Sequence, residues 1–158
     1  MQKQYDELFL LMDHIGKELE KLTELAQKKN AAAINDDITA INEIINREQA
    51  ESLAFRGFEN KRTELLKRLD LENVALSALA QQCPPEVKQR AEESVRKLQN
   101  QYEVYRGCAE VARRRMEENM HEIEHVLTSL GAQEKTEGPG YHSQKDEMPS
   151  NMKTDFHA

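Results

Sequence analysis

The chain has 158 residues, and its 29 acidic residues against 22 basic ones give a formal net charge of -7 at pH 7. This length favours a single domain, and the acidic balance argues against a general binder of nucleic acids or of acidic membranes. Aromatic residues make up only 5% of the chain, and the composition favours long helices over sheets.

Three further features bear on the compartment. The longest apolar run, residues 8–12, is far too short to span a membrane, and the N-terminus lacks the features of a signal peptide. Cys83 and Cys108 would lie about 37 Å apart along one helix, too far for a disulfide. Two free thiols fit a reducing cytosol, so we expect a cytoplasmic protein with no membrane insertion.

The first predicted helix spans about residues 2–33. Apolar side chains recur along it at steps of three and four residues, from Tyr5 to Ala33, which is the pattern of a heptad seam. The Asn35-Asp36-Asp37 segment that follows predicts a tight turn, with Asp36 or Asp37 as the N-cap of the next helix.

Two further long helices are predicted on either side of a proline pair. The second helix spans about residues 37–80, and its seam is apolar at both ends but polar in the middle. Pro84-Pro85 breaks the chain, because proline is tolerated at the start of a helix but not inside it. The third helix spans about residues 85–130 and stops at Gly131; every seam position from Val87 to Leu130 is apolar or aromatic.

The similar lengths of the second and third helices predict a long antiparallel hairpin. Its register would place Gly57 opposite Gly107, and Glu51 near Arg113. We interpret the polar middle of the second helix as a layer of paired charges that fixes this register. The far end of the hairpin, residues 69–96, would then contain only two helices, which would allow a homodimer through that end.

The predicted fold is therefore all-α. Residues 1–130 form an elongated three-helix coiled-coil bundle, made of the antiparallel hairpin and the additional N-terminal helix. Residues 131–158 lose the apolar pattern and are rich in Gly, Pro, Ser, Lys and Glu, so they are predicted to be a disordered tail.

One segment matches the sequence motif of zinc peptidases. Residues 121–125, His-Glu-Ile-Glu-His, match the zinc-peptidase pattern in which two histidines bind the metal and the glutamate activates water. No third ligand is apparent, because His14 belongs to another predicted helix, and His142 and His157 belong to the tail. No motif for nucleotide binding or for a nucleophilic serine is present. We expect two solvated histidines and a protein that is not an enzyme.

Several segments together carry a family resemblance. They are Ile34-Asn35-Asp36-Asp37-Ile38 after the long first helix, the polar stretch 47–62, Asn119 with Ile123 and Leu130, and Gly138-Pro139-Gly140-Tyr141. With these segments the chain resembles the FlgN family of flagellar type III export chaperones.

The resemblance implies a function for particular residues. The family binds hook-associated proteins, which form the hook–filament junction, keeps their terminal helices from premature assembly and delivers them to the export gate without nucleotide or metal. Tyr141 is the position that the resemblance implies for contact with the gate. The resemblance implies substrate binding along the last helix, by Met116, Asn119, Met120, Ile123, Leu127 and Leu130.

Two alternatives remain open. A Met-containing stripe at helical spacing is more often part of a core than a binding site, although methionine adapts to varied partners. The chain could equally be a structural coiled coil, or another secretion adaptor without a dedicated substrate.

Overall fold

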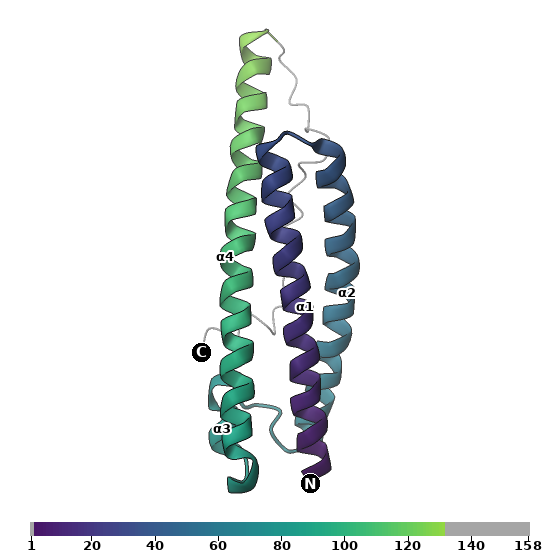
Figure 1. The fold of residues 1–158 in the computed structure, drawn as a ribbon, viewed down its shortest axis with the longest axis vertical. Helices are drawn as coiled ribbons and strands as arrows, with labels where there is room; N and C mark the ends of the chain where they lie inside the picture. The colour runs from purple at the N-terminus through teal and green to yellow at the C-terminus, as the bar shows by residue number, and fades with distance from the viewer. Residues whose placement is uncertain (1, 132–158) are drawn as a thin grey trace.

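The computed structural model describes residues 2–131, and most of them lie in helices. Three long helices, α1 (Gln2–Ile34), α2 (Ile38–Arg68) and α4 (Pro85–Ser129), run side by side and form an elongated bundle (Figure 1). A short 3₁₀ turn, η1 (Leu76–Ala78), and the short helix α3 (Leu79–Gln82) lie at the end where α4 begins. The predicted all-α class is confirmed; the predicted tail, with Tyr141, lies outside the described residues.

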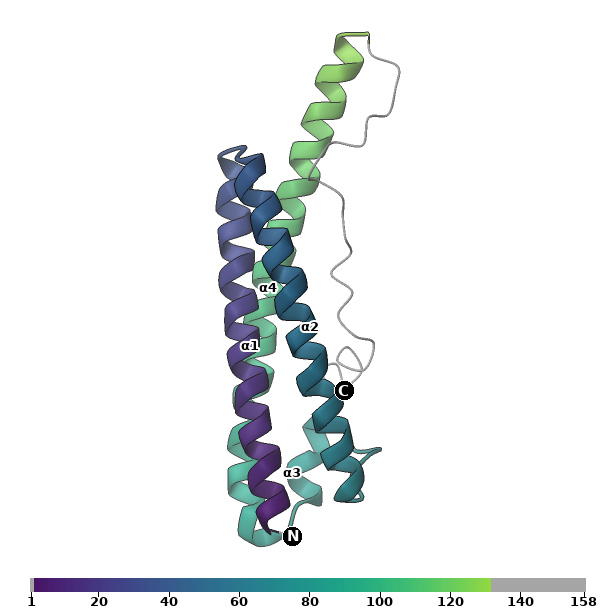
Figure 2. The ribbon, with the colours of Figure 1, turned by 90° about the vertical axis from the view of Figure 1, so that its right-hand side faces the viewer.

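The helix α1 is the centre of the bundle, because it packs against both α2 and α4. It runs antiparallel to α2 and parallel to α4, so α2 and α4 are antiparallel as predicted (Figures 1 and 2). One large core extends along these helices, from Tyr5 and Phe9 of α1 to Tyr105 of α4. A second, smaller core lies below the turn between α1 and α2 and includes Met116 of α4.

The turn between α1 and α2 forms as predicted. Asp37 is the N-cap of α2, and its side chain accepts a hydrogen bond from the Ala40 backbone N–H at 3.1 Å. This bond satisfies one of the unpaired donors at the start of the helix. Asp36 takes the left-handed conformation, with φ of 53°, which aspartate tolerates better than most residues.

The predicted extent of the second helix is wrong, because α2 ends at Arg68 rather than near residue 80. Asp70 adopts a left-handed φ of 59° and turns the chain back toward the bundle. This reversal buries four leucines that a continued helix would have spread along its length: Leu69, Leu71, Leu76 and Leu79. The two-helix end predicted for residues 69–96 is therefore also wrong, because the reversed segment joins the main core there.

The glycine pair predicted to mark the hairpin register makes no close contact. A Cβ atom built on Gly57 or Gly107 would meet no atom within 4 Å, so the two glycines do not mark a close approach of helices. Glu51 interacts with Glu18 of α1, whereas Arg113 pairs with carboxylates of its own helix. The physical reason is that α2 and α4 each have their close backbone contacts with α1, and their side chains meet in the shared core.

Buried charge pairs do occur in the polar middle of α2, and one of them joins α2 to α1. The Lys29 Nζ lies 2.9 and 3.0 Å from the two carboxylate oxygens of Glu48, and both side chains are buried. Farther along α2, Arg62 pairs with Glu59 at 2.9 Å, again out of solvent. The pair between Lys29 and Glu48 favours one alignment of α1 and α2, whereas the pair of Arg62 and Glu59 lies within α2.

Candidate functional site: the free end of the last helix

The helix α4 is longer than its neighbours, with 45 residues against 33 in α1 and 31 in α2. It begins beside the start of α1, where Arg90 pairs with Asp6. Near the end of α1, the Asn119 side-chain amide donates a hydrogen bond to the Ala33 carbonyl at 2.7 Å. Beyond Asn119, α4 continues past the α1–α2 turn by about 15 Å, given a rise of 1.5 Å per residue. Figures 1 and 2 show the last part of α4 projecting from the bundle. We call residues 121–130 the free end.

The apolar seam of α4 is covered along most of the helix and exposed at the free end. Val87, Leu98 and Met116 are all less than 10% exposed. One turn beyond the α1–α2 turn the exposed fraction rises sharply: 39% at Ile123, 55% at Val126 and 76% at Leu130. The seam thus continues where no other described helix lies against it.

The six residues predicted to bind substrate fall into two groups. Met116 and Asn119 are buried, and Met120 is half-buried against the smaller core. In the free end, Leu127 is half-buried, and Ile123 and Leu130 are exposed. Only the second group presents apolar surface to a partner, so a role for Met116 in direct contact would require that it leave the core.

The sequence-based site list missed three exposed apolar residues near the free end. Val126 follows Ile123 by three residues and so lies on the same face of α4, a spacing that could have identified it. Ile34 and Ile38 flank the α1–α2 turn and are 56% and 42% exposed. We call the residues Ile123, Val126, Leu127 and Leu130 the distal stripe.

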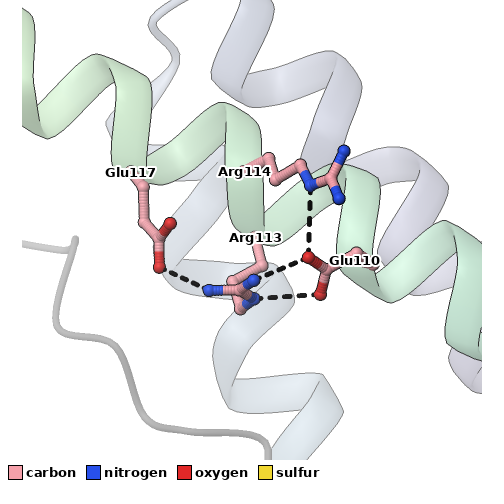
Figure 3. Close-up of polar contacts among 4 residues, drawn as sticks. All are labelled: Glu110, Arg113, Arg114 and Glu117. Carbon is pink, nitrogen blue, oxygen red and sulfur yellow. Dashed lines mark hydrogen bonds and ion pairs between the residues drawn. The ribbon is translucent and has the colours of Figure 1, made fainter.

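An ion-pair network covers the surface of α4 just below the free end (Figure 3). Arg113 binds Glu110 at 2.6 Å on one side and Glu117 at 2.6 Å on the other, and Arg114 also binds Glu110. The hydrogen bond from Arg113 is the main cause that lowers the pKa of Glu110. The arginines are thus engaged by carboxylates of their own helix, which favours a solvated, charge-paired face over a phosphate site.

The two histidines of the segment that matches the zinc-peptidase motif lie on the exposed surface of the free end. The His121 side chain is 83% exposed, and its Nδ1 lies 4.0 Å from Glu124 Oε2. Within residues 2–131, no three His, Cys, Asp or Glu side chains are grouped so that they could hold a metal ion. His142 and His157 lie outside the described residues.

None of the described helices is long and apolar enough to cross a membrane.

Comparison with known proteins indicates the family of the chain. Searches of curated proteins and of solved structures return no match. The model of one family, described as FlgN protein, matches residues 1–147. Because this match covers most of the chain, the resemblance in the sequence is confirmed: the protein belongs to the FlgN family of flagellar export chaperones.

Proposed function

We propose that this chaperone acts in the cytoplasm, binds the terminal helices of hook-associated proteins through the distal stripe, and delivers these proteins to the flagellar export gate. The single observation that supports the proposal is the exposure of an apolar helical seam beyond the α1–α2 turn, where Val126 and Leu130 are more than half exposed. An amphipathic helix is a natural partner for such a seam, because it can bury both apolar faces at once.

The covered part of α4 has a different role in this proposal. Met116, Asn119 and Met120 anchor α4 against the end of α1 and hold the distal stripe clear of the bundle. The site residues inferred from the resemblance thus divide into an anchor and a docking surface. Tyr141 remains the proposed contact with the export gate, in a segment separate from both.

A structural coiled coil is the main alternative function. Such a protein would use the exposed seam to associate with copies of itself, and it would need no other partner. The two functions differ in a direct measurement, because a chaperone remains monomeric at this end until a substrate is added. Size-exclusion chromatography of the full chain, alone and with a hook-associated protein, separates them.

Substitution of the distal stripe tests the proposal. We expect Ile123→Asp to weaken binding of a hook-associated protein by tenfold or more, since a buried apolar contact contributes about 1.5–3 kcal/mol. Val111→Asp is the matched control, because Val111 is a 54% exposed valine of the same helix, outside the free end. Isothermal titration calorimetry measures both affinities, and circular dichroism verifies that both variants remain helical.

Two outcomes would contradict the proposal. The first is a folded Ile123→Asp variant that binds as tightly as the unmodified chain. The second is an equal loss of affinity in the Val111→Asp control, which would mean that added charge alone, rather than the distal stripe, governs binding.

For the gate contact we expect Tyr141→Ala to retain affinity for the substrate and to impair its export. A loss of substrate binding would contradict the division between gate contact and docking surface.

A further inference from the structure

The end of the bundle has an unusual distribution of charge around its exposed apolar residues. Neither residues 30–46, around the α1–α2 turn, nor residues 116–131, which include the free end, contain a single lysine or arginine. The same two segments carry seven carboxylates: Asp36, Asp37, Glu43, Glu117, Glu118, Glu122 and Glu124. This end of the molecule is therefore acidic, although 22 basic residues occur elsewhere in the chain.

Among the described residues, arginine side chains pair with carboxylates in the lower part of this acidic region. Arg113 pairs with Glu117 at 2.6 Å, and Arg115 approaches Glu118 at 3.5 Å. Glu122 and Glu124 lie farther along α4, beside the distal stripe, and are exposed. The helix α4 contains no lysine or arginine beyond Arg115, so no basic side chain of its own helix lies beside these two carboxylates.

The α1–α2 turn adds a second apolar element to the same end. The hydrogen bond from Asn119 to the Ala33 carbonyl fixes α4 against the last turn of α1, one residue before Ile34. Ile123 follows Asn119 by one helical turn, on the same face of α4. The exposed Ile34 and Ile38 therefore lie at the same end of the bundle as the distal stripe. We call the six apolar residues together the end surface: Ile34, Ile38, Ile123, Val126, Leu127 and Leu130.

We infer that the end surface selects an amphipathic helix whose apolar stripe is flanked by lysine or arginine, and that Ile34 and Ile38 contact this helix together with α4. The inference rests on the proposed function and names the chemistry of the partner helix. Charge complementarity carries it, because the exposed carboxylates border the apolar residues on both α4 and the turn. The same charge disfavours an anionic membrane and a second copy of this chain, each of which would bring like charges together.

Two peptides test the charge preference on the full chain. Both are amphipathic helices with the same leucine stripe, and they differ only in flanking residues, lysine in one and glutamate in the other. We expect the chain to bind the lysine-flanked peptide at least tenfold more tightly, and added salt to reduce that difference. The double substitution Glu122→Lys with Glu124→Lys should reverse the preference. The matched control is Glu92→Lys with Glu93→Lys, an equal change of charge at exposed positions near the other end of α4, and it should retain the preference.

A second variant tests how much the α1–α2 turn contributes to binding of the partner helix. Ile34→Ser with Ile38→Ser should weaken binding of the lysine-flanked peptide by about tenfold, because both side chains expose apolar surface that the partner helix would cover. Leu53→Ser is the control, since Leu53 is a 67% exposed residue near the middle of α2. Equal binding by the Ile34/Ile38 variant and the unmodified chain would overturn this part of the inference.

The outcomes separate this inference from the proposed function. If Ile123→Asp weakens binding of a hook-associated protein, while the Glu122/Glu124 variant shows no change in peptide preference, the charge inference is wrong and the proposed function stands. If Ile123→Asp has no effect on that binding, both are wrong. Dimerisation of the unmodified chain through the end surface, seen as a concentration-dependent mass that Ile123→Asp abolishes, would also overturn the choice of partner.

Discussion

The two ends of α4 share one apolar pattern and have opposite surroundings. From Val87 to Met116 the seam is buried against α1 and its neighbours, whereas from Ile123 to Leu130 the same pattern is exposed. The periodicity of a sequence indicates which face of a helix is apolar, but the lengths of neighbouring helices decide whether that face is covered. In this protein α1 ends beside Asn119 of α4. The proposed substrate-binding surface of α4 begins one helical turn beyond that residue.

The largest expected effect is the difference in unfolding free energy between leucine-to-alanine substitutions at the two ends of α4. Leu98 is 2% exposed in the covered part of α4, and Leu130 is 76% exposed at the free end. Leu98→Ala should lower the free energy of unfolding by about 2–5 kcal/mol, because it leaves a cavity in a packed core. Leu130→Ala should change it by less than about 0.5 kcal/mol. Chemical denaturation measures both values, and losses of similar size would mean that the free end is also packed.

A smaller effect is expected at the boundary between the two ends. Asn119→Ala removes the 2.7 Å hydrogen bond to Ala33 and leaves that carbonyl without this donor in a buried location. We expect a loss of about 1–3 kcal/mol in the free energy of unfolding. The variant should also bind a hook-associated protein less tightly, because the anchor of the distal stripe is weakened. Full stability in this variant would show that the boundary is fixed by packing alone.

A pH-dependent effect distinguishes buried carboxylates from exposed ones. Burial, together with the neighbouring Glu51, raises the pKa of Glu18 above its ordinary value of 4.5. A raised pKa in the folded state means that folding favours the protonated carboxyl. The ionised Glu18 therefore destabilises the bundle at neutral pH, and this cost disappears as the pH falls through the raised pKa towards 4.5.

Glu18→Gln should accordingly raise the melting temperature at neutral pH, and its advantage over the unmodified chain should shrink as the pH falls through the raised pKa of Glu18 and be gone below about pH 4.5. Thermal melts across the pH range provide the measurement. A variant that is less stable than the unmodified chain at neutral pH would show that the interaction of Glu18 with Lys21 outweighs the cost of burial.

The smallest effect is expected in the exposed ion-pair network of Figure 3. Arg113 and its partner carboxylates are about half exposed, and exposed pairs on a helix contribute little to stability because water and salt screen them. Arg113→Ala should leave the melting temperature unchanged within error. A clear loss of stability would indicate that the network has a structural role beyond the surface of α4.

Local sequence signals predicted the elements well. The boundaries of α1 and α4 and the N-cap Asp37 depend on nearby residues, and all three were predictable. The end of α2 was not, because the left-handed Asp70 is stabilised by the burial of leucines against distant parts of the chain. The burial of Met116 likewise depends on the alignment of α4 with α1, which the spacing of apolar residues within one helix does not define.

The apolar face of α4 was therefore predictable from the sequence, but which part of that face is exposed was not. Met116 and Ile123 occupy the same seam in the sequence, yet one belongs to a core and the other is exposed. Ile34 and Ile38 were placed in the turn, but only the contact between Asn119 and Ala33 shows that this turn is level with the last covered part of α4.

Hydrogen exchange along α4, with and without a hook-associated protein, tests the central claim most directly. The account predicts slow exchange from Val87 to Met116 in both states, because packed helices open only through larger unfolding events. It predicts fast exchange at residues 121–130 in the free protein and marked protection there when the partner is added. Slow exchange of the free end without a partner, or protection that appears only elsewhere in the bundle, would contradict the account.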